Sequence, residues 1–335
     1  MQDPSTVVGL TSTIPVEVVF AAGLKPLDLN NLFITSPGRD QLLNQAERAG
    51  FGHNICSWIK GIYSTALNHH IQSVIAVTGG DCSNTLALAE VLERRGVRII
   101  PFDYPRDRDR ESLRRQINAL VDALGATWSE VETVKARLDR VRAKLRELDR
   151  LTYREGVVSG LENHLFLVGS SDFEGDVDAY EIRLERFLEE AKKRKAAAES
   201  VRVGFLGVPP ILDGIYEFLE SVGCRVVFNE VQRQFCIPFD APDLVDRYLM
   251  YTYPYGIEAR IEDIRRAVQE RKLDGLIHYA QTFCYRQIYD LIFRESLSLP
   301  LLTLEGDRPG KVDSRTQIRL ESFVEMLKMR KTDFP

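Results

Sequence analysis

The chain has 335 residues, of which 44% are hydrophobic and 28% charged, and these fractions exclude a disordered chain, a collagen-like chain and a coiled-coil rod. This length predicts two domains, because a domain usually has roughly 100–200 residues. The formal net charge of −5 leaves no overall positive field, so we expect neither nucleic acid nor a membrane surface as a partner.

The N-terminal segment lacks the features of a targeting signal. It has no basic start, and polar residues interrupt its apolar run, which differs from a secretory signal. No stretch of the chain reaches the about 18 consecutive apolar residues that a membrane helix needs. We therefore expect a cytoplasmic protein, in which thiols stay reduced and available as metal ligands.

The first third of the chain predicts alternating helices and strands. Helical patterns cover residues 40–49, 57–69 and 83–95, and short β-rich runs cover 73–81 and 97–105. The run at 73–81 ends in a Gly-rich turn. Strands that alternate with amphipathic helices indicate βαβ units and a parallel sheet.

The middle of the chain predicts charged helices over about residues 106–155 and over 172–200. The first contains a heptad-like seam of apolar residues, namely Val131, Val134, Leu138, Val141, Leu145 and Leu148. The seam has two interpretations. It packs on its own domain or on a neighbouring helix at 111–124, which we favour, or it joins two copies of the chain. The second helix is expected to connect two domains.

The last third predicts a second set of strands and helices. Strands are expected over 201–208, 224–230, 275–283 and 300–307, with helices over 213–222, 260–272, 285–296 and 314–331. The predicted fold is therefore α/β, with two flavodoxin-like (Rossmann-like) parallel-sheet domains and a helical insertion or connector. We place the N-terminal domain at residues 1–165, the connector at 166–200 and the C-terminal domain at 201–335.

Three of the five cysteines occupy similar positions in this scheme. Cys56 precedes a predicted helix, while Cys82 and Cys284 each follow a predicted strand and precede a helix. Ligands of open α/β sheets bind at the carboxyl ends of the strands. Helix N-termini also favour thiolates and the negative charge of a thiolate-bound iron–sulfur cluster. The placement therefore indicates a shared metal site, although isolated buried thiols remain the alternative because no C-x-x-C pair is present.

The other two cysteines do not share this placement. Cys224 opens a predicted strand, so it is expected at the opposite edge of the sheet as a buried structural thiol. Cys236 lies in a predicted loop, and its position relative to the others stays open. Five scattered cysteines are too few for a disulfide framework in a chain of this length.

Several sequence runs carry a family resemblance. They are PVEVVFAAGLKPLDL (15–29), NICSWIK (54–60), VTGGDCSN (77–84), RVVFNE (225–230), GLIHYAQTFCYRQ (275–287) and LLTLEGDRPGKVDSRTQIRLESFVEML (301–327). In these runs the chain resembles the 2-hydroxyacyl-CoA dehydratase and benzoyl-CoA reductase family, and specifically its D-component-like subunits.

The resemblance implies a [4Fe–4S] cluster in the cleft between two flavodoxin-like domains. By motif, Cys56, Cys82 and Cys284 hold the cluster, and its fourth iron is open to water or substrate. An ATP-hydrolysing iron–sulfur activator delivers single electrons of very low potential, and the dehydratases use one to form a ketyl radical from a (R)-2-hydroxyacyl-CoA. The resemblance also implies a homodimer or a heterodimer with a similar subunit.

Departures from the family pattern leave the substrate open. Only fourteen residues precede Pro15, Cys236 is displaced from the usual position of a cysteine, and YTYPYG (251–256) replaces a proline- and cysteine-rich segment. The chain is therefore expected to be a divergent short branch whose substrate need not be an acyl-CoA. The alternatives are a non-catalytic iron–sulfur electron carrier or scaffold, and a double-cubane-type reductase of a small molecule.

Polar residues beside the three cysteines are candidates for catalysis. Ser57, His278 and Glu305 are the candidate catalytic residues, because they follow a cysteine or lie on a strand that leads to the site. Arg286 is expected to offset the negative charge of the cluster, and Asp81 to cap a helix. No G-x-x-x-x-G-K-[ST] run is present, so we expect no ATP site.

Overall fold

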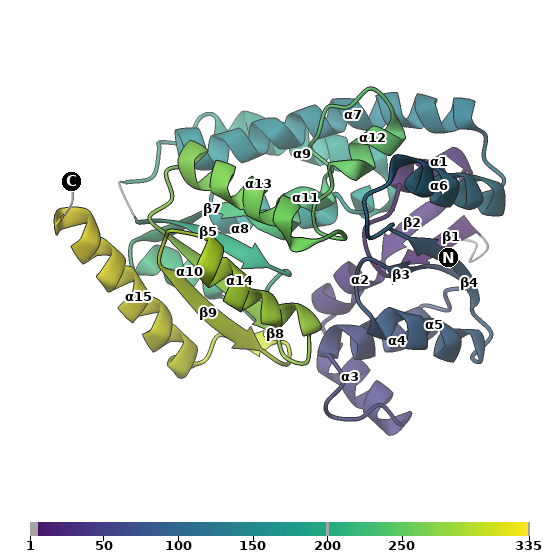
Figure 1. Cartoon of the computed structure of the whole chain (residues 1–335), viewed down its shortest axis with the longest axis horizontal. Coiled ribbons are helices and arrows are strands. Elements are labelled where there is room, and N and C mark those ends of the chain that lie inside the picture. Colours follow the sequence, from purple (N-terminus) through teal and green to yellow (C-terminus); the bar gives the residue numbers. More distant parts are fainter. Residues whose placement is uncertain (1–5, 199–200, 334–335) are drawn as a thin grey trace.

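The computed structural model describes residues 6–198 and 201–333, and it contains two four-stranded, all-parallel sheets (Figure 1). The first sheet has the order β2-β1-β3-β4 and the second the order β7-β5-β8-β9. Their strands are β1 (Val7–Leu10), β2 (Lys25–Asp28), β3 (Ser73–Gly79), β4 (Arg98–Asp103), β5 (Val201–Gly207), β7 (Cys224–Asn229), β8 (Gly275–Gln281) and β9 (Leu301–Gly306). The α/β fold predicted from the sequence is confirmed and is consistent with two Rossmann-like domains.

Both sheets have the same strand order, in which the second strand in sequence lies outside the first. The order reverses between β1 and β3 in one sheet and between β5 and β8 in the other. At such a switch point the two connections leave in opposite directions, which opens a crevice at the carboxyl ends of the strands. Each sheet therefore offers one ligand-binding edge. A short parallel pair, β6 (Leu212–Asp213) with β10 (Gly310–Lys311), lies outside both sheets.

Helices cover both sheets. In the first half they are α1 (Val16–Ala21), α2 (Leu29–Thr35), α3 (Arg39–Arg48), α4 (Ser57–Asn68), α5 (Asn84–Glu93) and α6 (Arg110–Leu124). In the second half they are α10 (Ile215–Ser221), α11 (Glu230–Phe235), α12 (Leu244–Leu249), α13 (Ile257–Glu270), α14 (Tyr289–Ser296) and α15 (Ser314–Asp333), with a 3-10 turn η4 (Tyr285–Ile288) before α14.

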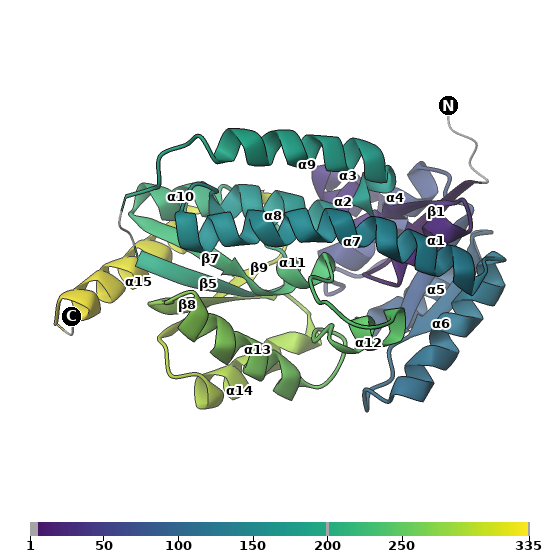
Figure 2. The same ribbon diagram turned by 90° about the horizontal axis from the view of Figure 1, so that it is seen from above.

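Helix α7 (Trp128–Arg150) runs lengthwise across the two halves of the molecule, with α8 (Gly160–Gly169) and α9 (Val177–Ala191) beside it (Figure 2). Helix α8 packs on β7 of the second sheet. Thr127 and Glu130 form a capping box that starts α7. Its apolar seam is buried against α1 and α9, with Leu138, Leu145 and Leu148 fully enclosed. The seam therefore packs within the chain, as we favoured, and the interpretation as a seam between two copies is wrong. A π-helical turn, η2 (Leu151–Glu155), ends the segment.

The prediction missed the shortest elements. Strands β1 and β2 have four residues each, which is too short for the alternation of apolar and polar residues to show. The predicted helix over 172–200 is shorter, because a 3-10 turn, η3 (Phe173–Gly175), precedes α9, and residues 199–200 lie outside the described residues. The predicted domain boundaries stay a prediction, and the one at residue 165 falls within α8. Among the described residues, no helix is long and apolar enough to span a bilayer.

Candidate functional site

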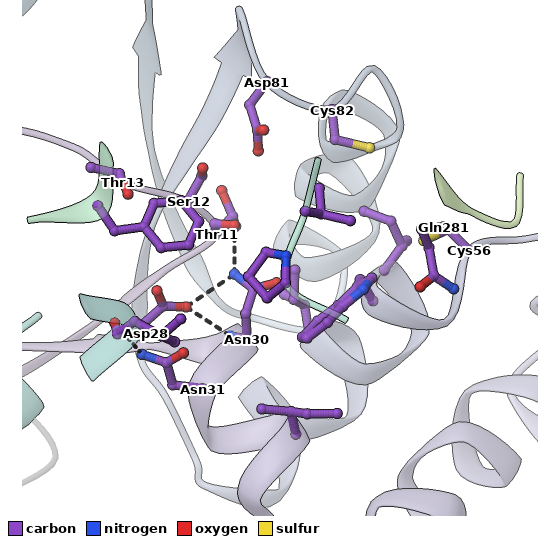
Figure 3. A pocket seen from close by; sticks show the side chains of 18 of the residues that line it. Thr11, Ser12, Thr13, Asp28, Asn30, Asn31, Cys56, Asp81, Cys82 and Gln281 are labelled. Atoms are coloured by element: carbon purple, nitrogen blue, oxygen red, sulfur yellow. Dashed lines mark hydrogen bonds between the residues drawn. The ribbon is translucent and has the colours of Figure 1, made fainter. Parts of the chain in front are cut away.

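A cavity of about 150 Å³ lies between the two sheets, and its wall includes the thiol-bearing residues Cys56, Cys82 and Cys284 (Figure 3). The first sheet contributes the segments after β1 and β3, and the second contributes Val208 to Pro210 after β5 and Gln281 at the end of β8. The cavity therefore lies where the two switch points face each other. We call it the cysteine cavity. Placement at carboxyl strand ends and helix starts is what the sequence predicted for these three cysteines.

Each of the three thiols lies at the start of a helix or turn. Cys56 precedes α4, Cys82 lies two residues before α5, and Cys284 precedes η4. Burial raises the pKa of the Cys56 thiol to about 11, and the backbone N–H groups of Trp58 and Ile59 oppose this rise. Burial likewise raises the pKa of Cys284, while the backbone N–H of Arg286 opposes the rise. The first turns thus direct N–H groups at the sulfur atoms.

The three sulfur atoms are also close enough to influence one another. Burial is the largest cause that raises the pKa of Cys82, to about 12, and the charges of Asp81, Cys56 and Cys284 add to it. Three neighbouring thiols in this environment remain protonated at neutral pH unless a positively charged group binds them. Metal binding releases these protons, because the thiolate is the form that ligates.

The donor set fits a multi-iron group better than a single ion. Among the described residues, no three His, Cys, Asp or Glu side chains are placed to hold one metal ion. A [4Fe–4S] cluster binds each thiolate through a different iron, so its ligands stand further apart than those of one ion. Three converging cysteines with N–H groups at their sulfurs therefore fit three corners of such a cluster.

The remaining cysteines lie elsewhere. Cys224 begins β7 and is fully buried against Val201, in the hydrophobic core of the second sheet. Cys236 follows α11, is 1% exposed, and donates its thiol proton to the Arg233 carbonyl at 3.1 Å. Neither lines the cysteine cavity. The structure thus agrees with a structural role for Cys224 and resolves the open position of Cys236.

Two backbone conformations of positive φ position the cysteine loops. Gly80 has φ of +90°, and a Cβ there would lie 2.8 Å from the Pro254 carbonyl oxygen. Phe283 has φ of 64°, a value rare for a residue with a side chain, and its backbone turns the chain into Cys284. Gly80, two residues before Cys82, is therefore required by its close packing against Pro254.

Arg286 is a buried cation that makes no hydrogen bond to a carboxylate in the described part of the chain. Burial raises the pKa of the neighbouring Asp81 carboxyl and the charge of Arg286 opposes that rise, so Asp81 is its charge partner. Arg286 is 7% exposed, stacks 4.2 Å above the Tyr253 ring, and donates to the Gly80 carbonyl at 2.8 Å. Its Nε and Nη1 are buried without a hydrogen-bond partner. Tyr285 supports the same junction by donating to the Asp81 carbonyl at 2.6 Å. A buried cation beside Cys284, with two nitrogen atoms that lack a hydrogen-bond partner, suits a site that binds a negatively charged group.

Opposite the cysteines, the cavity has a polar wall that the sequence did not predict. Figure 3 shows Asp28, Asn30 and Asn31 on the far side of the cavity from Cys56 and Gln281. Asp28 caps α2, and its Oδ1 accepts from the Asn30 backbone N–H at 2.9 Å. An Asp before a helix is a helix start signal that the sequence contains at Asp28. It was missed because strand β2, which precedes it, has only four residues and was not predicted.

The candidate catalytic residues lie outside the cavity wall. The Ser57 hydroxyl is buried without a partner, and Glu305 is exposed on β9. His278 lines a smaller neighbouring cavity with Cys284 and Arg286, and its Nδ1 lies 2.9 Å from Asp290 Oδ1. Burial lowers the pKa of His278, so its ring is neutral at pH 7. Catalytic roles for Ser57, His278 and Glu305 stay predictions. Of these three residues, His278 lines a cavity together with one of the cysteines, Cys284.

Comparison with known proteins identifies a family. A family model described as 2-hydroxyglutaryl-CoA dehydratase, D-component, matches residues 11–327. No curated protein matches the chain. The matched range contains all five cysteines, the whole second sheet and every strand of the first sheet except β1. The resemblance predicted from the sequence motifs is therefore confirmed.

Proposed function

Since the chain belongs to the 2-hydroxyglutaryl-CoA dehydratase D-component family, we propose that it is an enzyme component that uses a [4Fe–4S] cluster. In this proposal Cys56, Cys82 and Cys284 hold three of the four irons. The observation that carries it is the convergence of these three cysteines, from separate helix starts, on one cavity between the sheets.

When bound, the cluster supplies one-electron chemistry at low potential and an iron that accepts an oxygen ligand. The chain's own residues have supporting roles. The first turns of α4, α5 and η4 direct N–H groups at the sulfurs and stabilise negative charge there. The guanidinium of Arg286 stabilises the added electron by its positive charge, because charges interact strongly in a buried site. The apolar side of the cavity, including Ile59 and Ile62, excludes water.

The substrate in this proposal is an acyl-CoA-like thioester, which undergoes radical dehydration or reduction. An ATP-hydrolysing iron–sulfur activator supplies the electrons. A second similar subunit, identical or not, completes the assembly, which we place in the cytoplasm. The location of Cys236 supports an enzyme over an electron carrier, because no fourth cysteine reaches the cavity to close the last iron site.

Anaerobic reconstitution of the full chain tests the cluster. We expect close to four irons and four sulfides per chain and the electron paramagnetic resonance signal of a reduced [4Fe–4S] cluster. Cys56→Ser, Cys82→Ser and Cys284→Ser should each lose most of the bound iron. Cys224→Ser and Cys236→Ser are matched controls, because they remove a buried thiol outside the cavity and should retain it.

Two outcomes contradict the proposal. Fewer than about three irons in the reconstituted wild-type chain would exclude a [4Fe–4S] cluster. Equal iron loss in all five cysteine variants would show that the three cysteines of the cavity do not bind iron in preference to Cys224 and Cys236. A stable cluster whose spectrum is unchanged by acyl-CoA thioesters would instead favour the electron carrier.

A further inference from the structure

The cysteine cavity is small for the ligands that the proposed function gives it. Its volume is about 150 Å³, whereas small-molecule sites usually have about 300–1,000 Å³. A cluster held by three cysteines and the acyl part of a thioester would have to share this space. The wall therefore has to move before a thioester enters, and the contacts that join the two halves of the chain around the cavity indicate where.

A first contact joins α3 to strand β6. The Arg39 guanidinium donates to Asp213 Oδ1 at 3.1 Å and to the Ile34 carbonyl at 3.2 Å. Its Nη2 pairs with the other carboxylate oxygen of Asp213. Ile34 lines the cavity, and Asp213 follows the wall residue Pro210 closely in the chain. The side chains of Arg39 and Asp213 are 23% and 47% exposed, so solvent reaches this pair.

A second contact joins α3 to the segment after β9. Arg308 Nη1 lies 2.9 Å from Glu47 Oε1, and Arg308 Nη2 donates to Asn44 Oδ1 at 3.2 Å. Arg308 follows Asp307, whose carbonyl accepts from Nε2 of the wall residue Gln281 at 2.8 Å. The side chains of Arg308 and Glu47 are 37% and 18% exposed, so this pair is also reached by solvent.

Both ion pairs hold the same helix of the first half to the second half. We call them, Arg39–Asp213 and Arg308–Glu47, the α3 latches. Partly exposed ion pairs contribute little to stability, and salt weakens them further, so opening the wall at α3 costs less than breaking buried contacts. Glu47 also pairs with Lys60 of α4 at 2.9 Å, so its carboxylate keeps a cation when Arg308 moves away.

A different junction beside the cavity joins the halves through backbone carbonyls. Arg286, 7% exposed, donates to the Gly80 carbonyl at 2.8 Å, and Tyr285 donates to the Asp81 carbonyl at 2.6 Å. These bonds connect the loop after β3 to the turn η4. Salt screens the buried Arg286 contact much less than the latches, so we expect this junction to stay closed when the latches open.

We infer that ligands enter the cysteine cavity at its α3 edge, through opening of the two α3 latches, while the junction at Arg286 stays closed. The inference concerns access to the site and rests on the proposed function, which requires ligands larger than the closed cavity. The alkylation rate of Cys56 measures the opening, because Cys56 is 6% exposed and lies in the segment that connects α3 to α4. Cys224 and Cys236, which are 0% and 1% exposed outside the cavity, measure unfolding of the chain.

The test follows alkylation by iodoacetamide at each cysteine of the metal-free full chain, at one fixed pH, by mass spectrometry of its peptides. Asp213→Asn and Arg308→Met each remove one latch. We expect each variant to raise the alkylation rate of Cys56 about threefold, and the two together to raise it about tenfold. The rates at Cys224 and Cys236 should stay unchanged.

Glu325→Gln is the matched control, because it removes an exposed ion pair with Lys328 that lies within α15 and does not join the halves. It should leave the rate at Cys56 unchanged. Added salt should raise the rate at Cys56 in the wild type, and it should have a smaller effect in the double variant, which has no latch left to screen.

Each contrary outcome overturns the inference in a different way. A rate at Cys56 that the latch variants leave unchanged, or that Glu325→Gln raises equally, shows that the latches do not control access. An equal rise at Cys224 shows that the variants unfold the chain. The alkylation test uses no iron, so it decides the entrance alone, whereas the iron content of the reconstituted chain decides the proposed function.

Discussion

The cysteine cavity and the interior beneath α7 are both buried, but the arginines in the two regions have different hydrogen-bond partners. Beneath α7, Arg271 donates to both carboxylate oxygens of Asp149, at 2.9 and 2.5 Å, and Arg142 lies 2.7 Å from Glu17. At the cavity, Arg286 contacts only backbone carbonyls and aromatic rings. A buried cation with N–H groups that lack a hydrogen-bond partner costs stability, so Arg286 marks a place beside Cys284 that suits a negatively charged group.

Breaking a pair beneath α7 should have the largest effect on stability. Arg271→Met leaves Asp149 without its cation and also removes stacking on the Tyr153 ring, 4.5 Å away. We expect the free energy of unfolding to fall by about 3–5 kcal/mol, the usual cost of an uncompensated buried charge. Chemical denaturation measures it. Arg186→Met, at an exposed position on α9, is the control and should change it by less than about 0.5 kcal/mol. A loss below about 1 kcal/mol in Arg271→Met would contradict the comparison.

The ion pair between Arg271 and Asp149 should also make the free energy of unfolding depend on pH. Burial raises the pKa of Asp149, but the charge and hydrogen bonds of Arg271, with smaller contributions from Arg233 and Asn163, together outweigh burial, and the pKa lies below its ordinary value. The pair therefore contributes stability above the unfolded carboxyl pKa of about 3.9 and loses it as the pH falls through the lower folded value. The difference in unfolding free energy between the wild type and Asp149→Asn should be full at pH 7 and shrink toward pH 3. A difference independent of pH would show that the carboxylate charge is not what stabilises.

Near the cysteine cavity, we expect a substitution that disturbs the backbone at Gly80 to cost more stability than the removal of the charge of Arg286. Gly80→Ala places a methyl group against the Pro254 carbonyl in a conformation of positive φ. We expect a loss of about 1–3 kcal/mol in unfolding free energy and reduced iron binding, because the loop carries Cys82. Gly256→Ala is the control, since its φ is −63° and a Cβ there meets nothing within 4 Å. Similar stability of the two variants would contradict the packing argument.

The smallest effect on stability is expected at Arg286. Arg286→Met should change the unfolding free energy of the metal-free chain by less than about 1 kcal/mol, because burial of the charge is costly and its guanidinium makes no hydrogen bond to a carboxylate. In the reconstituted chain the reduction potential should become more negative, since a positive charge that favours the added electron is lost. Redox titration followed by electron paramagnetic resonance measures the shift, and Arg286→Lys should restore part of it. An unchanged potential would mean that Arg286 only joins the two halves.

The elements that could be predicted from the sequence were those whose own short segment shows a clear pattern of apolar residues. The strands that became β3, β5, β7, β8 and β9 carry long apolar runs, and the cysteine positions follow from where those runs end. Strands β1 and β2 are too short to show a pattern, so the wall with Asp28 and Asn30 was not predicted. The candidate Ser57 was chosen because it follows Cys56 in sequence, and Glu305 because it lies at the carboxyl end of a predicted strand. Neither position determines the direction in which a side chain points.

Sequence alone determined the fold class, the family and the three cysteines, because periodicity, turn residues and motif order are properties of short segments. Only the tertiary structure decided that both switch points face one cavity, that Cys236 stays outside it, and that Arg286 makes its hydrogen bonds, among the described residues, to backbone carbonyls and not to a carboxylate. These facts depend on how segments more than 200 residues apart pack, as between Tyr285 and Asp81. Some polar groups are buried with a hydrogen-bond partner and others without one, and this difference determines which ligands the site can bind.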